Sequence, residues 1–291
     1  MSTLTKSASP RLNTRQVYEL TLAGAAGGVF GLYLYVELVQ TADIWVRDAL
    51  AGAILGGSLG YFLNAAAPLT EGAWLKLARA SCWGAIAGAA GGAAGLLLGE
   101  WVLGGFQGGL IGRACSWAVL GLGIGLSQGL ASWSLTRLRF GLIGGVLGGF
   151  VGGLLFEALR DGLGNRYDLS QGLGIVVLGA GLGLFLAMVE QILRRAWVQV
   201  VQGRQEGRAY LLGTSRARLG LDEHAEVGLF GDPAVARQHA EIQAKGGTFT
   251  LVNLDPSGRT SVNGQVVSAP TVLKDGDRIV LGKTGLIFRQ R

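Results

Sequence analysis

The chain has 291 residues, of which 51 are glycine and only 15% are charged, and its mean hydropathy is +0.41. Glycine does not recur at every third position and proline is scarce, which excludes collagen, while the abundant leucine, valine and phenylalanine exclude a disordered glycine-rich linker. The class that remains is an integral membrane protein. Lysine and arginine become dense only after residue 193, which indicates two domains, 1–195 and 196–291.

Six apolar segments are long enough for a helix to cross a hydrocarbon core about 30 Å thick. They run approximately over residues 17–39, 48–66, 80–98, 115–133, 140–159 and 171–192. The third and fourth are the weakest of these predictions, because glycine lowers their hydropathy, and residues 101–111 between them could extend a helix or re-enter the bilayer. Because residues 1–16 are polar and the first apolar segment is long enough to span, we expect an uncleaved anchor rather than a signal peptide.

Basic residues in the loops predict which side of the membrane each loop occupies, since lysine and arginine resist translocation. On the side of the N-terminus lie Lys6, Arg11, Arg15, Lys76, Arg79, Arg137, Arg139, Arg194 and Arg195. On the other side lie only Arg47, Arg113, Arg160 and Arg166. We therefore expect a multi-pass protein of the cytoplasmic (inner) membrane with both termini in the cytoplasm. A basic chain can indicate nucleic-acid binding, but this rule already accounts for the basic residues at the helix ends. We therefore expect no nucleic-acid partner.

An internal repeat supports six helices independently of hydropathy. The odd-numbered segments share the motif Gly-x-x-Gly-Gly-x-x-Gly, and the even-numbered segments share Leu-Gly-x-x-(Leu or Ile)-Gly at 55–60, 120–125 and 178–183. The odd motif occurs as Gly24, Gly27, Gly28, Gly31, then Gly88, Gly91, Gly92, Gly95, then Gly145, Gly148, Gly149, Gly152. Successive copies are 64 and 57 residues apart in the odd motif and 65 and 58 in the even motif. The sequence therefore predicts three tandem helical hairpins of about 60 residues each.

These glycines predict close helix packing. In lipid, small residues four apart let helix backbones approach closely, and the pattern resembles a glycine zipper. Packing within one bundle is the simpler interpretation, and assembly of a homo-oligomer through the same faces is the alternative.

The odd segments end alike, with Glu37, Glu100 and Glu157 shortly after the motif. A carboxylate in the middle of a membrane is costly and marks an ion path. These three lie near the outer boundary instead, so we expect solvated residues at helix ends, with membrane lipid around the helices, and a functional acidic ring is the alternative. The segments carry no charge in their middles, which argues against a proton-coupled transporter.

From residue 196 the pattern changes to short alternating strands separated by Gly, Asp-Pro and Asn-Gly turns, which predicts an all-β sandwich. The predicted strands are 197–201, 209–212, 226–229, 239–244, 248–254, 266–267, 278–280 and 285–288. Three stretches in this region resemble the forkhead-associated (FHA) domain: 231–242, which contains Arg-Gln-His-Ala, 260–264, which reads Thr-Ser-Val-Asn-Gly, and 273–282.

The resemblance implies recognition of a cytoplasmic protein partner, in the family usually one phosphorylated on threonine, through loops at one end of the sandwich. We expect the binding surface to include Arg216, Arg218, Arg237, His239, Ser257, Arg259, Thr260 and Asn263. Leu221 stands where the family has its phosphate-binding arginine, Ala236 where it has a serine, and Gly258 where it has an asparagine. Losing one charged hydrogen bond costs about 1.5–3 kcal/mol, so both phosphate-independent contact and phosphopeptide binding remain open. His239 is expected to support the loop from beneath.

No nucleophile with its base, metal-ligand cluster or nucleotide loop is evident, so we expect neither an enzyme nor a cofactor. The leading interpretation is a membrane-embedded scaffold or signalling protein that recruits a partner through its FHA-like domain. The alternative is a glycine-zipper oligomer that forms a pore or channel regulated by that domain. Because the sixth helix ends beside the first strand, the β domain is expected to lie close to the membrane with a restricted orientation.

Overall fold

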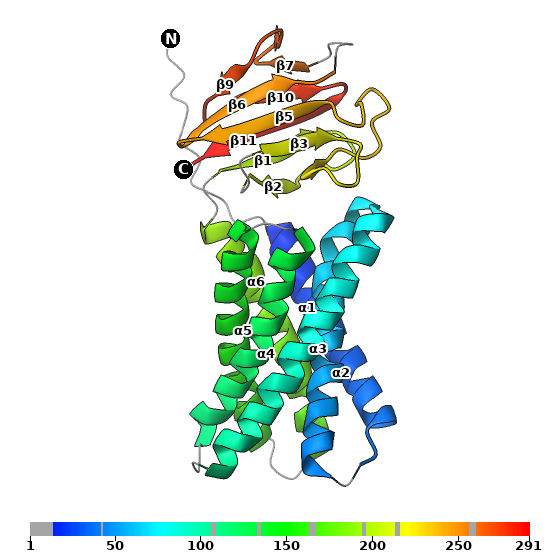
Figure 1. The fold of residues 1–291 in the computed structure, drawn as a ribbon, viewed down its shortest axis with the longest axis vertical. Coiled ribbons are helices and arrows are strands. Elements are labelled where there is room, and N and C mark those ends of the chain that lie inside the picture. The colour runs from blue at the N-terminus through cyan, green and yellow to red at the C-terminus, as the bar shows by residue number, and fades with distance from the viewer. Residues whose placement is uncertain are drawn as a thin grey trace.

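The computed structural model describes residues 14–41, 43–105, 109–132, 135–162, 167–193, 196–212, 216–255 and 260–291. Within these ranges the chain forms six α-helices followed by a β-sandwich (Figure 1). The helices are α1 (Thr14–Leu38), α2 (Ile44–Glu71), α3 (Trp74–Gly105), α4 (Gly109–Ser132), α5 (Leu135–Gly162) and α6 (Tyr167–Leu193). All six described helices are long and apolar enough, by length and composition, to cross a membrane.

The helices extend beyond the predicted apolar segments because their polar ends are also helical. At the start of α2, the Asp43 carboxylate accepts a hydrogen bond from Val46 N at 3.0 Å and caps the helix. At its end, Gly72 adopts a left-handed φ of 72° and closes the last turn. Helix α3 continues to Gly105, and residues 106–108 of the stretch that could re-enter the bilayer lie outside the described residues.

The helices form a closed ring in which each packs against the next and α6 packs against α1. Three antiparallel pairs, α2–α3, α4–α5 and α6–α1, meet along what we call glycine seams. An ideal Cβ on Gly56 would lie only 2.1 Å from the carbonyl oxygen of Gly88, and one on Gly88 only 2.2 Å from that of Gly56. The equivalent facing pairs are Gly52 with Gly92 and Gly60 with Gly84, then Gly121 with Gly145 and Gly125 with Gly141, and finally Gly179 with Gly24.

The remaining motif glycines face the other neighbour. Gly27 and Gly31 pack on α2, Gly91 and Gly95 on α4, and Gly148 and Gly152 on α6. Each odd helix therefore uses the first and third glycines of its motif against one even helix and the second and fourth against the other. All twelve motif glycines contact neighbouring helices of the same chain.

The even helices lie nearest the centre of the ring, because half or more of each apolar span is buried in α2, α4 and α6 and less in α1, α3 and α5. Their side chains form one buried cluster, to which each hairpin contributes equivalent residues of its repeat. These are Leu55, Leu120 and Leu178, and then Leu59, Ile124 and Leu182, all at most 5% exposed. The described part of the bundle therefore has an aliphatic core.

The prediction that Glu157 is a solvated residue at a helix end is wrong. Its side chain is 2% exposed, and its Oε2 lies 2.9 Å from Nε of Arg113. Arg113 is on α4, which packs directly against α5, so the carboxylate turns toward this partner instead of solvent. A buried charge is tolerated when it is paired in this way.

The C-terminal part is a sandwich of two sheets in the described residues. One sheet has the order β2-β1-β11-β10-β7-β8 and the other β4-β3-β5-β6-β9. The strands are β1 (Ala196–Gln202), β2 (Ala209–Leu211), β3 (Arg216–Gly220), β4 (Val227–Gly228), β5 (Ala240–Lys245), β6 (Thr248–Asn253), β7 (Thr260–Val262), β8 (Gln265–Val266), β9 (Thr271–Leu273), β10 (Arg278–Leu281) and β11 (Thr284–Gln290). Pairing is antiparallel except between β3 and β4.

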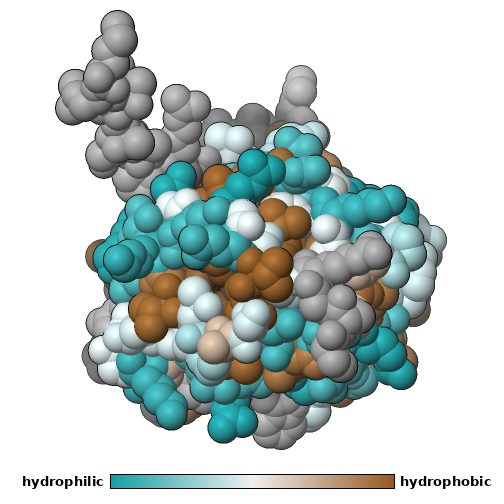
Figure 2. Space-filling view, turned by 90° about the horizontal axis from the view of Figure 1, so that it is seen from above, coloured by the Kyte–Doolittle hydropathy of each residue, from teal (hydrophilic) through white to brown (hydrophobic). Residues whose placement is uncertain are grey.

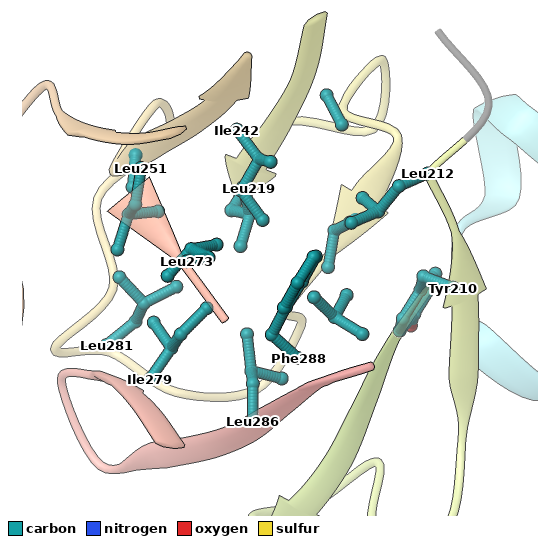
Figure 3. Close-up of a cluster of buried hydrophobic side chains, with 14 of the residues drawn as sticks. Tyr210, Leu212, Leu219, Ile242, Leu251, Leu273, Ile279, Leu281, Leu286 and Phe288 are labelled. Atoms are coloured by element: carbon teal, nitrogen blue, oxygen red, sulfur yellow. The ribbon is translucent and has the colours of Figure 1, made fainter. Parts of the chain in front are cut away.

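Alternate residues of the strands point between the two sheets and form the core (Figure 3). Leu219, Ile242 and Leu251 come from one sheet, and Leu286 and Phe288 come from the other. Strands β3, β7 and β9 were not among those predicted, although the alternation of Arg216, Ala217, Arg218 and Leu219 is the pattern of a strand with one buried face.

Candidate functional site

Three loops gather at one end of the sandwich: 221–226 after β3, 229–239 after β4, and the described start, 254–255, of the loop after β6. We call this region the loop end, and Figure 1 shows the first two of these loops, in yellow, on one side of the sandwich. Leu221 N donates to the carbonyl of Ala236 at 3.1 Å, and Asp222 N donates to that of Arg237 at 3.0 Å. The approach is so close that a Cβ on Gly220 would lie 2.1 Å from the Arg237 carbonyl oxygen.

His239 holds the three loops together from inside the domain. Its side chain is fully buried, and its Nδ1 accepts a hydrogen bond from Ala236 N at 3.0 Å. Its carbonyl accepts from Leu254 N and Asp255 N, at the start of the third loop. Burial lowers the pKa of His239, although the nearby Asp255 carboxylate opposes this shift. The neutral imidazole therefore supports the loops and does not reach a partner, as the resemblance implied.

Asp232 fixes the second loop to the turn between β10 and β11. Its carboxylate accepts hydrogen bonds from Ala234 N at 3.0 Å, Lys283 N at 2.8 Å and Thr284 Oγ1 at 2.9 Å. Burial alone would raise the pKa of Asp232, but these hydrogen bonds and the Lys283 charge outweigh it, so the pKa lies below its usual value. Nothing in the sequence marked Asp232 beyond its place in an Asp-Pro turn.

Leu221, at the position of the family's phosphate-binding arginine, packs its side chain against the core of the sandwich. Of the predicted arginines, Arg237 is exposed on the second loop. Arg218 lies on β3, where its guanidinium contacts Glu226 at 3.5 Å and the carbonyl of His224 at 3.4 Å. Arg216 is also on β3 and lies 3.8 Å from Glu241.

Of the other predicted binding residues, one is buried, one lies at the opposite end of the sandwich, and two lie outside the described residues. Thr260 is buried and donates its hydroxyl to Asn253 Oδ1 at 2.9 Å, so it stabilises the third loop and does not face a partner. Asn263 lies at the other end of β7, with a left-handed φ of 53°, and bonds to Asp277 and Arg278. It belongs to the opposite end of the sandwich. Ser257 and Arg259 lie outside the described residues.

The loop end also contacts the helical bundle, which sequence reasoning did not detect beyond the short junction. The Glu223 carboxylate of the first loop accepts a hydrogen bond from Leu75 N of α3 at 2.8 Å. Arg208, beside β2, lies 3.0 Å from Glu71 of α2 and also bonds to the hydroxyl of Thr70. The Glu71 and Arg208 side chains are 6% and 11% exposed, so this ion pair is buried between the two parts.

Among the described residues, no group of three or more His, Cys, Asp or Glu side chains is placed to hold a metal ion. The described loop end offers one exposed cationic side chain, Arg237, beside the carboxylates of Asp222 and Glu226, so contact with a peptide or an anionic group would centre on Arg237.

Comparisons with known proteins identify this end of the chain. Residues 207–282 match the FHA domain family. Glycogen accumulation regulator GarA of Mycolicibacterium smegmatis is 32% identical over 93 residues, which are 32% of this chain and 58% of GarA. GarA of Mycobacterium tuberculosis is 30% identical over 93 residues, or 56% of its length. The chain thus spans about half the length of these curated relatives.

Solved FHA domains are similar over the same part. One, solved in an analysis of phosphothreonine-dependent FHA domain interactions, is 33% identical, with a TM-score of 0.30, and the match covers 33% of this chain and 97% of that one. The FHA domain of FhaA, solved in complex with the intracellular domain of Rv3910, is 32% identical, with a TM-score of 0.30, and the match covers 32% and 99%.

Proposed function

Because its C-terminal domain is an FHA domain, we propose that this chain is a membrane-embedded adaptor that recruits a cytoplasmic protein partner. The six described helices form the membrane anchor, in this proposal with both termini in the cytoplasm, and the loop end of the FHA domain binds the partner. The observation that carries the proposal is the fixed set of three loops, held by His239, that presents Arg237 to solvent.

The surfaces of the two parts support this division. Large apolar side chains are exposed along the helices, for example Tyr33, Ile86 and Leu147 at 60%, 62% and 43%. Lipid would cover such side chains, whereas in water they would promote aggregation. Viewed from the FHA end, the molecule shows hydrophilic residues around its rim and a band of hydrophobic residues across the middle of the face (Figure 2).

In this proposal the FHA domain binds phosphate more weakly than a domain with the family's arginine at position 221. Arg237 is then the main cationic side chain at the loop end. Leu221 supplies no charge, so a phosphothreonine partner would lose about 1.5–3 kcal/mol relative to a site with an arginine there. Contacts that do not involve phosphate then contribute a larger share of the affinity.

The alternative of a pore through the bundle has less support. A buried aliphatic cluster joins the even helices, and each glycine seam is used within the chain. A hydrated path needs polar side chains or an open lumen. A packed anchor fits these observations better than a channel.

The proposal is tested with the full chain in nanodiscs and a threonine peptide library, phosphorylated and unphosphorylated. We expect selective binding that the variant R237A weakens about tenfold. K245A is the matched control, because Lys245 is an exposed cation at the opposite end of β5. Binding that depends on phosphate indicates a signalling reader, and equal binding of both forms indicates a scaffold. Absence of binding, or equal loss in both variants, would refute recruitment through the loop end.

A further inference from the structure

Two cavities meet where the FHA domain contacts the helices. The first, of about 220 Å³, lies between the ends of the helices and the FHA domain, and we call it the vestibule. The second, of about 450 Å³, is a groove beside α3. Four residues line both cavities: Lys76, Arg79, Glu223 and His224. We call these four residues the junction.

The junction has two cationic side chains, Lys76 and Arg79, and one carboxylate, that of Glu223, and the adjoining vestibule wall adds charges of both signs. Besides Lys76 and Arg79, Arg137 and Arg208 line this wall, and both repel the Lys76 ammonium. The Glu71 carboxylate is shared between Lys76 at 3.2 Å and Arg208 at 3.0 Å. In all, five Lys and Arg side chains and five Glu side chains line the vestibule, so the excess of positive charge is confined to the junction.

The other charged groups of the vestibule have hydrogen-bond or ion-pair partners of their own. Arg15 and Glu19 of α1 form an ion pair at 2.8 Å, and Glu226 pairs with Arg218. Glu190 accepts a hydrogen bond from Gln16 at 2.8 Å. At the junction, Glu223 is bound by Leu75 N, and His224 is 3.1 Å from Asp222. Arg79 makes no hydrogen bond or ion pair with a described residue, so it is available to an anion.

The groove that leads away from Arg79 has an apolar wall. Leu75, Trp83 and Ile86 line it and are 60%, 39% and 62% exposed. These residues are on the outer face of α3, with the FHA loop above them through Glu223. A cation at one end of an exposed apolar groove matches the two parts of a phospholipid, a charged headgroup and an acyl chain.

We propose that the junction binds the phosphate of an anionic membrane phospholipid, whose acyl chain lies in the groove of α3. Arg79 donates to the phosphate, Lys76 contributes the second positive charge, and the lipid occupies the space beneath loop 221–226. The bound lipid then helps to hold the FHA domain against the helices. This inference rests on the proposed membrane insertion but not on recognition of a protein partner.

The test uses the full chain in detergent, titrated with phosphatidylglycerol, with bound lipid counted by native mass spectrometry. We expect wild type to retain the lipid, and R79A and the milder variant R79Q to bind it about tenfold more weakly. R139A is the matched control, because Arg139 is an exposed arginine of α5 that lines neither cavity. Thermal unfolding checks that all variants are folded.

Equal weakening in R79A and R139A would show only general attraction between basic helix ends and anionic lipid, and would overturn the proposal. Displacement of the lipid by inorganic phosphate at equal concentration would assign the site to a soluble anion, which also overturns it. Extraction of membranes at alkaline pH tests insertion of wild type and R79A separately. A failure of insertion is therefore distinguished from a failure of the lipid site.

Discussion

Replacement of Gly56 by alanine is expected to destabilise the helical bundle by about 1–3 kcal/mol, the usual cost of overpacking. The new Cβ would lie 2.1 Å from the carbonyl oxygen of Gly88, and atoms do not approach closer than 3.0 Å in such contacts. The obstructing atom belongs to a helix backbone, so no side chain can rotate away. Helices α2 and α3 must separate, which also loosens the contacts of Gly52 and Gly60 on the same seam.

Gly57→Ala is the matched control for this prediction. A Cβ at Gly57 would lie 3.5 Å from Ala85 O and from Ala89 Cβ, which is ordinary van der Waals distance. Alanine also has the higher helix propensity, by about 1 kcal/mol in water. We therefore expect G57A to be neutral or slightly stabilising in the same bundle.

The assay is unfolding of the full chain in mild detergent by titration with a denaturing detergent, followed by circular dichroism. Equal midpoints for G56A and G57A would refute the argument from close backbone contact. If the seams instead join subunits, G56A would lower the oligomeric state while leaving monomer unfolding unchanged. Size-exclusion chromatography with light scattering separates these outcomes.

The remaining predictions concern the FHA domain. His239→Asn retains an acceptor for the Ala236 N–H but cannot titrate. Because burial lowers the pKa of His239, wild-type stability is complete above the unfolded pKa of about 6.5 and decreases as the pH falls below it. Thermal melting of the domain in the full chain between pH 7 and pH 5 should show this decrease in wild type and a smaller one in H239N, and equal slopes would contradict it. Leu221→Arg should strengthen phosphothreonine-peptide binding about 10- to 100-fold in calorimetric titration, whereas an unchanged affinity would show that position 221 does not limit phosphate recognition.

The number of helices could be predicted from the sequence, but the contacts between individual glycines could not. Paired motifs at matched offsets are a strong signal, because hydropathy and repeat spacing indicate the same hairpins independently. Which glycine faces which neighbour, however, depends on closure of the ring. The contact of Gly179 with Gly24 joins the last helix to the first, and no local pattern specifies it.

Individual charged residues were harder to place than whole elements. Glu37, Glu100 and Glu157 each follow their motif by five or six residues. Glu157 alone of the three is buried, because Arg113 on the neighbouring helix lies 2.9 Å away. In the same way, Arg208 and Glu71 are 137 residues apart in the sequence and meet only when the FHA domain docks. Such pairs depend on tertiary contact, which a periodic pattern does not encode.

The contacts between the two parts make the bundle a platform for the FHA domain. Each glycine seam brings two helix backbones into contact, and an aliphatic cluster is buried between the helices, so the ring is closely packed. Loop 221–226 is bound to α3 through Glu223, and the same loop is bonded to loop 229–239, which carries Arg237. A partner at the loop end therefore meets a surface whose orientation is fixed by the helices. Under the proposed membrane insertion, that surface faces along the membrane, which favours partners whose binding segment also lies close to the bilayer.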